Sequence, residues 1–387
     1  MIRRVGWIVG GLIAAALFVF FAFAPGWLEA SANRVTHGPW EVSPAARALH
    51  ATLTIVDLHE DTLLWRRDLT RASRHGQVDL PRLEAGNVAL ATFSSVTKTP
   101  RGQNYESNTD RTDNITYLAI AQLQPVRTWG SLLQRSLWHA EKLRRAERID
   151  PGFRIVRSVA DLDAGLAARR AGRLRTMGLL SVEGLHNLEG RFDNLDVLFR
   201  AGFRMGGLAH FFDNELAGSM HGVKKGGLTP FGRKVMAAME DRGMIVDVAH
   251  ASHATIADVI AAARKPVVFS HGGVKGTCNT NRNLTDAEIR GIARTGGVMG
   301  IGLWDVASCS TTPVGAAKAM KYVRDLVGIG TVALGSDFDG AVAEPIDVAG
   351  LAALTQALLD QGFTPDEVRA AMGGNALRVL RADLPPR

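Results

Sequence analysis

Short apolar runs recur along the chain from about residue 53, and segments with helical patterning lie between most of them. The runs are rich in β-branched and small residues, as expected for the buried strands of a parallel sheet. They lie at 53–58, 88–95, 176–182, 204–209, 244–249, 266–270, 297–303 and 331–336. Eight strands that alternate with helices predict an α/β fold, a closed (β/α)8 barrel of the TIM type.

Residues typical of helix ends mark several of the segments between the runs. Thr229 followed by Pro230 is a favourable helix start, and Gly243 is a favourable stop. Thr285 with Glu288 three residues later has the spacing of a capping box. The predicted helices span 229–243, 252–266, 285–297 and 364–381, the last broken at Gly373-Gly374.

The interval 96–175 departs from this regular alternation. A long polar stretch at 97–114 follows the second strand, and mostly helical patterning with a break near Pro125 follows it. Long loops at the catalytic end of a barrel often cover the substrate. A surface excursion without a catalytic part is the alternative.

The N-terminus carries an uncharged run of 24 residues, Val5–Leu28. Such a run is long enough to cross a hydrocarbon core of ~30 Å as a helix, and Arg3-Arg4 before it favours a cytoplasmic N-terminus. We expect an uncleaved anchor at 1–28, a linker at 29–44 and a metal-dependent barrel domain at 45–387. A signal peptide cleaved after 22–24 or 30–32 is the competing interpretation. Either one places the barrel outside the cytoplasm, in the periplasm of a bacterium.

The net charge is +7, and the basic residues are spread over many short segments. We interpret this as a solvated surface, with attraction to anionic lipid headgroups as the alternative. Nucleic acid is not an expected partner, because no basic stripe is interleaved with aromatic residues. The two cysteines, Cys278 and Cys309, either pair outside the cytoplasm or are two buried thiols.

Histidines and carboxylates directly follow most of the apolar runs, at the strand ends where barrel enzymes carry their active sites. The candidate metal ligands are His59, Asp61, Glu183, His250 and His271. Imidazole and carboxylate ligands suit zinc or a similar divalent ion.

The spacing of these ligands predicts a site for two ions. His59 and Asp61 are two residues apart in an extended segment, so their side chains share a face and can hold one ion. His250 and His271 can hold a second ion, and Glu183 has two oxygens with which to bridge the pair. Two ions ~3.5–4 Å apart lower the pKa of a shared water and polarise a carbonyl oxygen, which is the chemistry of amide hydrolysis.

Further polar residues at the same strand ends are candidates for handling the substrate. His210 can stabilise a developing oxyanion, and Arg282 can hold a substrate carboxylate. Asp337 can carry a proton from the water to the leaving amine. Asp57 and Asp247 either support the ligands or cap turns.

Motifs along the chain resemble those of the membrane dipeptidase (renal dipeptidase) family, which has amidohydrolase-type metal barrels. The motifs are "DLHED" (57–61), "VDLPRLEAGNVAL" (78–90), "SVEGLH" (181–186), "LTPFGRKVMAAMEDRGMIVDVAHAS" (228–252), "PVVFSHGG" (266–273), "NRNLTD" (281–286), "GSDFDG" (335–340) and "GGNALRVL" (373–380). They cover essentially everything after residue 50.

The resemblance implies a binuclear zinc site, with Glu183 shared between an ion on His59 and Asp61 and an ion on His250 and His271. It also implies substrate contacts from three residues, which are His210, Arg282 and Asp337. Members of the family cleave dipeptides with a free C-terminal carboxylate, tolerate a D-residue at that end, open some β-lactams and are often homodimers.

The chain departs from the family pattern at Leu58 and Leu185, where glycine is usual, and in segments 211–222 and 302–312. Because those segments line the expected substrate pocket, two alternatives stay open. One is a metal-dependent amidase acting on an N-acyl amino acid, a lactam or a specialised peptide. The other is a barrel that binds a ligand without turnover.

Overall fold

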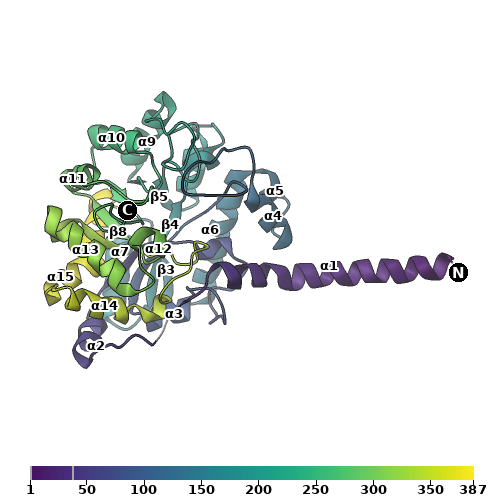
Figure 1. Cartoon of the computed structure of the whole chain (residues 1–387), viewed down its shortest axis with the longest axis horizontal. Coiled ribbons are helices and arrows are strands. Elements are labelled where there is room, and N and C mark those ends of the chain that lie inside the picture. Colours follow the sequence, from purple (N-terminus) through teal and green to yellow (C-terminus); the bar gives the residue numbers. More distant parts are fainter. Residues whose placement is uncertain (1, 37–38) are drawn as a thin grey trace.

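A closed parallel β-barrel surrounded by helices forms the body of the protein, as the computed structural model of residues 2–36 and 39–387 shows (Figure 1). The strands are β1 (Ile55–Glu60), β2 (Val88–Phe93), β3 (Phe153–Ile155), β4 (Thr176–Val182), β5 (Phe203–Gly207), β6 (Ile245–Asp247), β7 (Val268–Phe269), β8 (Val298–Ile301) and β9 (Val332–Leu334). The helices are α1 (Ile2–Ala32), α2 (Pro44–Ala51), α3 (Leu80–Ala85), α4 (Asn114–Ala121), α5 (Arg127–Gly130), α6 (Leu132–Ile149), α7 (Val159–Arg170), α8 (Asn194–Arg200), α9 (Pro230–Arg242), α10 (His253–Ala262), α11 (Asp286–Arg294), α12 (Asp305–Ser308), α13 (Pro313–Val327), α14 (Ala352–Asp360), α15 (Pro365–Arg369) and α16 (Asn375–Asp383).

Pairing between β2 and β4 closes the barrel. The strands follow the order β2-β1-β9-β8-β7-β6-β5-β4, and residues 90–93 of β2 pair with residues 177–180 of β4 to join the two edges. The predicted eight-stranded barrel is therefore confirmed. The ninth strand, β3, was not predicted; it pairs alongside the first residues of β4.

The predicted helix ends are also confirmed at the positions where the sequence has capping residues. The Thr229 hydroxyl accepts a hydrogen bond from the Gly232 amide at the start of α9, and Gly243 ends that helix with a φ of 73°. Thr285 and Glu288 form the capping box of α11. The segment 364–381 is divided into α15, a π-helical turn and α16, and a Cβ on Gly373 would lie 1.9 Å from the Thr54 carbonyl oxygen. Glycine thus lets this turn approach the start of β1.

Helix α16 covers the end of the barrel where the strands begin, which we call the closed end. The Arg378 guanidinium donates to the carbonyls of Gly296 and Gly330, just before β8 and β9. Leu377 and Leu380 of α16 belong to one apolar cluster with residues of the barrel strands. The opposite end, where the strands finish, is here called the open end.

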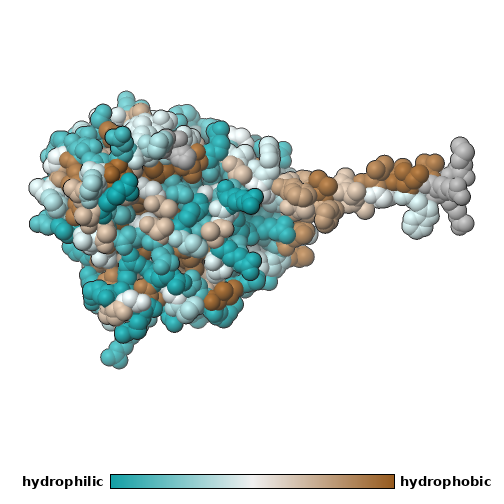
Figure 2. All heavy atoms as spheres, turned by 90° about the horizontal axis from the view of Figure 1, so that it is seen from below, coloured by the Kyte–Doolittle hydropathy of each residue, from teal (hydrophilic) through white to brown (hydrophobic). Residues whose placement is uncertain are grey.

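Helix α1 is the one helix within the described residues that is long and apolar enough to cross a membrane, over Trp7–Ala32. Residues 7–20 are exposed, and the helix projects from the body as a single apolar rod (Figures 1 and 2). Its first part thus has the dimensions and surface of a membrane-spanning segment.

The last turns of α1 are attached to the open end of the barrel. Glu29 is 2% exposed and pairs with Arg67, which also pairs with Asp339 in the loop after β9. The Asn33 side-chain oxygen accepts a hydrogen bond from the Ala341 amide at 2.8 Å. A buried ion pair of this kind fixes the base of α1 beside the barrel mouth.

The predicted linker at 29–44 therefore contains segments with different environments. Residues 29–32 continue α1, and the Thr36 amide donates to the Glu344 carbonyl. Residues 37–38 lie outside the described residues, and Pro44 begins α2.

Candidate metal centre

Histidines and carboxylates converge at the open end of the barrel. His59 lies within the last residues of β1, and the others follow the ends of their strands. All five predicted ligands are buried: His59, Asp61, Glu183, His250 and His271. Because parallel strands finish at the same edge, residues up to 212 positions apart in sequence meet in one place.

Glu183 is the centre of this cluster. Its Oε1 lies 3.5 Å from His59 Nε2, 3.0 Å from His250 Nε2 and 3.4 Å from His271 Nε2. Its Oε2 lies 3.4 Å from His210 Nε2. The structure therefore brings together the carboxylate predicted to bridge and histidines from both halves of the predicted site.

A second group of donor atoms surrounds His59. Its Nε2 lies 3.6 Å from Asp61 Oδ1 and 4.0 Å from Asp337 Oδ1. Three overlapping sets of side chains each have donor atoms within 4.8 Å of one another: His59, Glu183 and His271; Glu183, His210 and His250; and His59, Asp61 and Asp337. Sequence reasoning treated Asp337 as a proton carrier, and this geometry also makes it a candidate metal ligand.

The electrostatics of the cluster fit a divalent cation. Burial lowers the pKa of His250 and of His271 well below the usual value, and burial raises the pKa of Glu183 well above it. The Nε2 atoms of His250 and His271 lie 2.9 Å apart. The neutral imidazole nitrogens of His250 and His271 beside a buried carboxylate are donors of the kind that zinc and related ions bind.

A hydrogen-bond chain behind the cluster orients His271. The Ser270 hydroxyl donates to Asp247 Oδ2 at 2.6 Å and lies 2.9 Å from His271 Nδ1. Since that hydroxyl proton is used on Asp247, the hydroxyl oxygen accepts from Nδ1–H, which leaves Nε2 free to bind a cation. Asp57 accepts hydrogen bonds from the backbone amides of His59 and Ser336. It therefore has the capping role, which was one of the two alternatives that the sequence left open for it.

Two of the candidate residues have strained backbones. His250 and Asp337 have φ angles of 62° and 68°, in the left-handed region that is unfavourable for residues with a side chain. Conformations of this kind cost about 1–3 kcal/mol each and cluster at functional sites.

Arg282 lies beside the cluster with two unused donors. It is fully buried; its Nη2 donates to the His271 carbonyl at 2.6 Å, while Nε and Nη1 have no hydrogen-bond partner within the described residues. The guanidinium lies over the rings of Phe269 and Trp304. A buried guanidinium with free donors is suited to a carboxylate from outside the chain.

A cavity of about 310 Å³ is lined by residues of this cluster together with apolar side chains. The polar lining includes Glu183, His210 and Arg282. The apolar lining includes Ile115 of α4 and Ala32 from the base of α1. Sequence reasoning missed the contributions of α1 and α4, because no motif marks them. Trp304 lies in the segment 302–312 that was expected to line the pocket, and Tyr105 lies in the loop 97–114 that was a candidate cover for the substrate.

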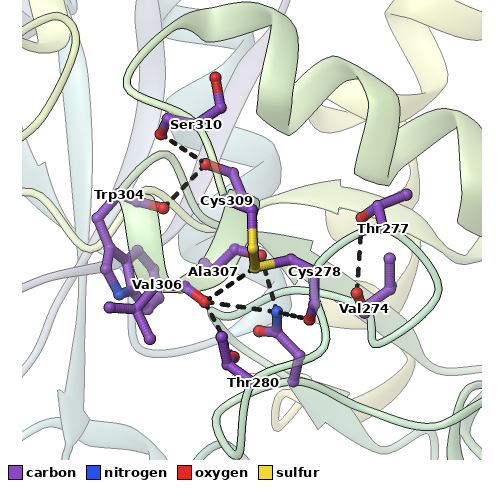
Figure 3. The surroundings of a disulfide bond; sticks show 11 residues. Val274, Thr277, Cys278, Thr280, Trp304, Val306, Ala307, Cys309 and Ser310 are labelled. Carbon is purple, nitrogen blue, oxygen red and sulfur yellow. Dashed lines mark hydrogen bonds between the residues drawn. A yellow bond between two sulfur atoms is a disulfide. The ribbon is translucent and has the colours of Figure 1, made fainter.

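A disulfide joins two loops that line the cavity (Figure 3). Cys278 belongs to the loop after β7, which also carries Arg282, and Cys309 follows Trp304 in the segment after β8. The alternative that sequence left open between paired and free cysteines is thus decided in favour of pairing.

The fold and the ligand cluster define a metal-dependent hydrolase barrel. The Membrane dipeptidase family (Peptidase family M19) matches residues 44–384, and the chain belongs to that family. It is therefore a peptide-bond hydrolase of the metallo-dipeptidase class, as the sequence motifs predicted.

Named relatives agree with this assignment. The chain is 30% identical to dipeptidase aclJ of Aspergillus oryzae, over 95% of this chain and 86% of the relative, and 26% identical to dipeptidase ataJ of Aspergillus terreus, over 87% and 86%.

Solved structures share the fold. The probable dipeptidase PvdM from Pseudomonas aeruginosa superposes with a TM-score of 0.72 at 19% identity, covering 88% of this chain and 98% of that one. A metallopeptidase from Rhodobacter sphaeroides, solved with a phosphinate mimic of the dipeptide L-Ala-D-Ala, gives 0.70 at 22% identity, covering 86% and 99%.

Proposed function

We propose that the protein is a zinc-dependent dipeptidase that uses two ions and selects dipeptides with a free C-terminal carboxylate. The convergence of His59, His250 and His271 on the Glu183 carboxylate supports two ions that share this residue. His59 and Asp61 would hold one ion with Glu183, and His250 and His271 would hold the other. Bound there, the ions would activate water and polarise the scissile carbonyl.

Three residues of the chain would act on the dipeptide itself. Arg282 would bind the C-terminal carboxylate through its free donors, which fixes the peptide bond over the ligand cluster. His210, 3.4 Å from Glu183 Oε2, would donate to the oxygen that becomes negative during attack. Asp337, 4.0 Å from His59 Nε2, would take up a proton and deliver it to the departing amine.

The natural substrate class is tested by a panel of compounds. The purified enzyme is assayed on dipeptides, on dipeptides amidated at the C-terminus, on N-acyl amino acids and on lactams, beside elemental analysis of the same preparation. We expect about two zinc ions per chain, fastest turnover of free dipeptides, and loss of turnover after chelation. Preference for an acylated amino acid or a lactam would favour the amidase alternative, and two ions without any turnover would favour a binding protein.

We also propose that α1 is retained as an anchor, with the barrel outside the cytoplasm. Glu29 and Asn33 are built into the open end, so cleavage after residue 32 would remove a buried ion-pair partner. The Cys278–Cys309 disulfide fits an oxidising compartment. The full chain should stay in the membrane pellet after an alkaline carbonate wash and keep its original N-terminus; release of a chain beginning near residue 33 would contradict retention.

A further inference from the structure

A cavity rich in basic side chains lies beside α1, apart from the metal centre. It has a volume of about 490 Å³ and lies between the turn at residues 66–69 and α6. One face of α6 contributes Trp138, Arg145 and Arg148, which are spaced by seven and three residues. The metal-dependent reaction uses none of these side chains.

Four arginines that line this cavity form no ion pair within the described residues. Within the described residues, no carboxylate oxygen lies within 4.0 Å of the guanidinium of Arg66, Arg144, Arg145 or Arg148, whereas many other arginines are paired. Two acids also line the cavity, and each has another partner: Glu141 pairs with Arg127 at 2.7 Å, and Asp68 lies 3.8 Å from Arg71. The cavity therefore presents several guanidinium groups without a carboxylate partner to an anion from outside the chain.

Contacts with α1 place this cavity at the level of the membrane surface. Pro25 has no amide hydrogen, so the Phe21 carbonyl lacks its partner within the helix, and Arg66 donates to that carbonyl at 2.9 Å. Helix α1 is exposed over residues 7–20 and first meets the body near Phe21. From Val5, the first residue after Arg3-Arg4, to Phe21 the helix rises about 24 Å, most of the thickness of a hydrocarbon core of about 30 Å. The surface beside Phe21 must then lie against the lipid headgroups.

We propose that this cavity binds the phosphate headgroup of an anionic phospholipid. The inference rests on the proposed anchoring by α1, which brings the cavity to the bilayer. Guanidinium groups match phosphate oxygens in geometry and charge, and Trp138 is of the residue type enriched at membrane interfaces. A free phosphate offers the same chemistry, but the position of Arg66 on the anchor helix favours the lipid. The bound headgroup would fix the rotation and height of the barrel on the membrane.

The experiment uses the full chain in dodecylmaltoside micelles and phosphatidylglycerol labelled with pyrene on an acyl chain. Energy transfer from tryptophan to pyrene measures binding, and unlabelled phosphatidylglycerol, phosphatidylcholine and inorganic phosphate are the competitors. We expect phosphatidylglycerol alone to displace the probe. The double variant Arg145→Gln/Arg148→Gln should bind the probe about 30-fold more weakly, since each basic residue near an anionic surface contributes about fivefold.

The matched control is Arg170→Gln/Arg173→Gln, which removes two exposed charges near the closed end of the barrel that form no ion pair within the part of the chain that the structure describes. It should bind the probe like the unchanged protein, and both variants should keep their turnover of a soluble dipeptide. Equal displacement by phosphatidylcholine, displacement by inorganic phosphate, or equal weakening in the two variants would overturn the proposal.

A carbonate wash of native membranes separates this proposal from the proposed anchoring. A wild-type chain that leaves the membrane but still selects phosphatidylglycerol in micelles would contradict the anchoring and leave the lipid site standing. A chain that stays in the membrane but shows no selectivity would contradict the lipid site alone.

Discussion

A buried carboxylate at the closed end of the barrel and buried nitrogens at the open end differ in how the chain satisfies them. At the closed end, the Glu240 carboxylate accepts hydrogen bonds from the Arg264 amide, the Arg264 side chain and the Lys265 amide. At the open end, His59 and Arg282 carry buried nitrogens without partners within the described residues. The Glu240 carboxylate is thus satisfied by the chain alone, whereas the unpartnered nitrogens at the open end are available to ligands from outside the chain. Stability and function are thus assigned to different ends of one β-barrel.

The largest effect on turnover is expected when the same change is made to a buried glutamate at each end. Glu183→Gln should lower kcat/KM by about 1,000-fold or more and reduce the metal content, because the shared carboxylate charge is lost. Glu240→Gln should leave kcat/KM and metal content within twofold of the unchanged protein. It should lower the Tm by a few degrees, because the hydrogen bonds that the charged carboxylate accepts become weaker with a neutral amide. Turnover and metal content are measured on both proteins, and equal losses in the two would erase the distinction between the ends.

A smaller effect, confined to one class of substrate, is expected for Arg282→Met. Free dipeptides should lose about 30- to 1,000-fold in kcat/KM, which corresponds to the removal of one partner from a buried charged pair. Dipeptides amidated at the C-terminus should change by less than about threefold. Equal losses for free and amidated substrates would show that Arg282 has another role.

Ser270→Ala tests the support behind the ligands. Without the hydroxyl, His271 Nδ1 loses its acceptor, and metal affinity should fall by about 10- to 100-fold in a chelator competition. Ser158→Ala removes the hydroxyl that caps α7, where it accepts from the Asp161 amide. That control should cost about 1 kcal/mol of stability and leave metal affinity unchanged. Unchanged affinity in Ser270→Ala would contradict the orienting role.

The smallest effect on turnover is expected for Leu380→Ala, in the apolar cluster of the closed end. The side chain is buried, so the cavity left behind should lower the free energy of unfolding by about 2–5 kcal/mol. Turnover per folded molecule at 25 °C should stay the same. Denaturant unfolding and active-site titration check both statements, and a loss of turnover without a loss of stability would show that the two ends are coupled.

Local patterns explain why much of the barrel could be predicted. A few neighbouring residues are enough to indicate a strand, through their apolar pattern, or a helix cap such as Thr285 with Glu288. The five ligands could be proposed because each directly follows a recognisable strand. β3 was missed because the charged and exposed Arg154 interrupts its two apolar residues, so no apolar run marks it. The helices between 96 and 175 carry mixed patterns.

The remaining features depend on contacts between distant segments. In the sequence, Glu29 is simply the first charged residue after an apolar run. Only the folded chain shows that it pairs with Arg67 beside the open end of the barrel. The free donors of Arg282 likewise become visible only when its burial is known. The division of ligands between two ions stays a prediction, since Asp337 lies within reach of the same group as His59 and Asp61.

The bond between Cys278 and Cys309 makes one wall of the substrate cavity dependent on thiol chemistry. Closing a segment of about 30 residues removes freedom from the unfolded chain and holds the loop of Arg282 against the loop of Trp304. Protein produced in a reducing cytosol would still bring the candidate metal ligands together, but these two loops would not be joined by the disulfide. Preparations from different hosts would then contain similar amounts of metal but differ in how firmly they hold a carboxylate.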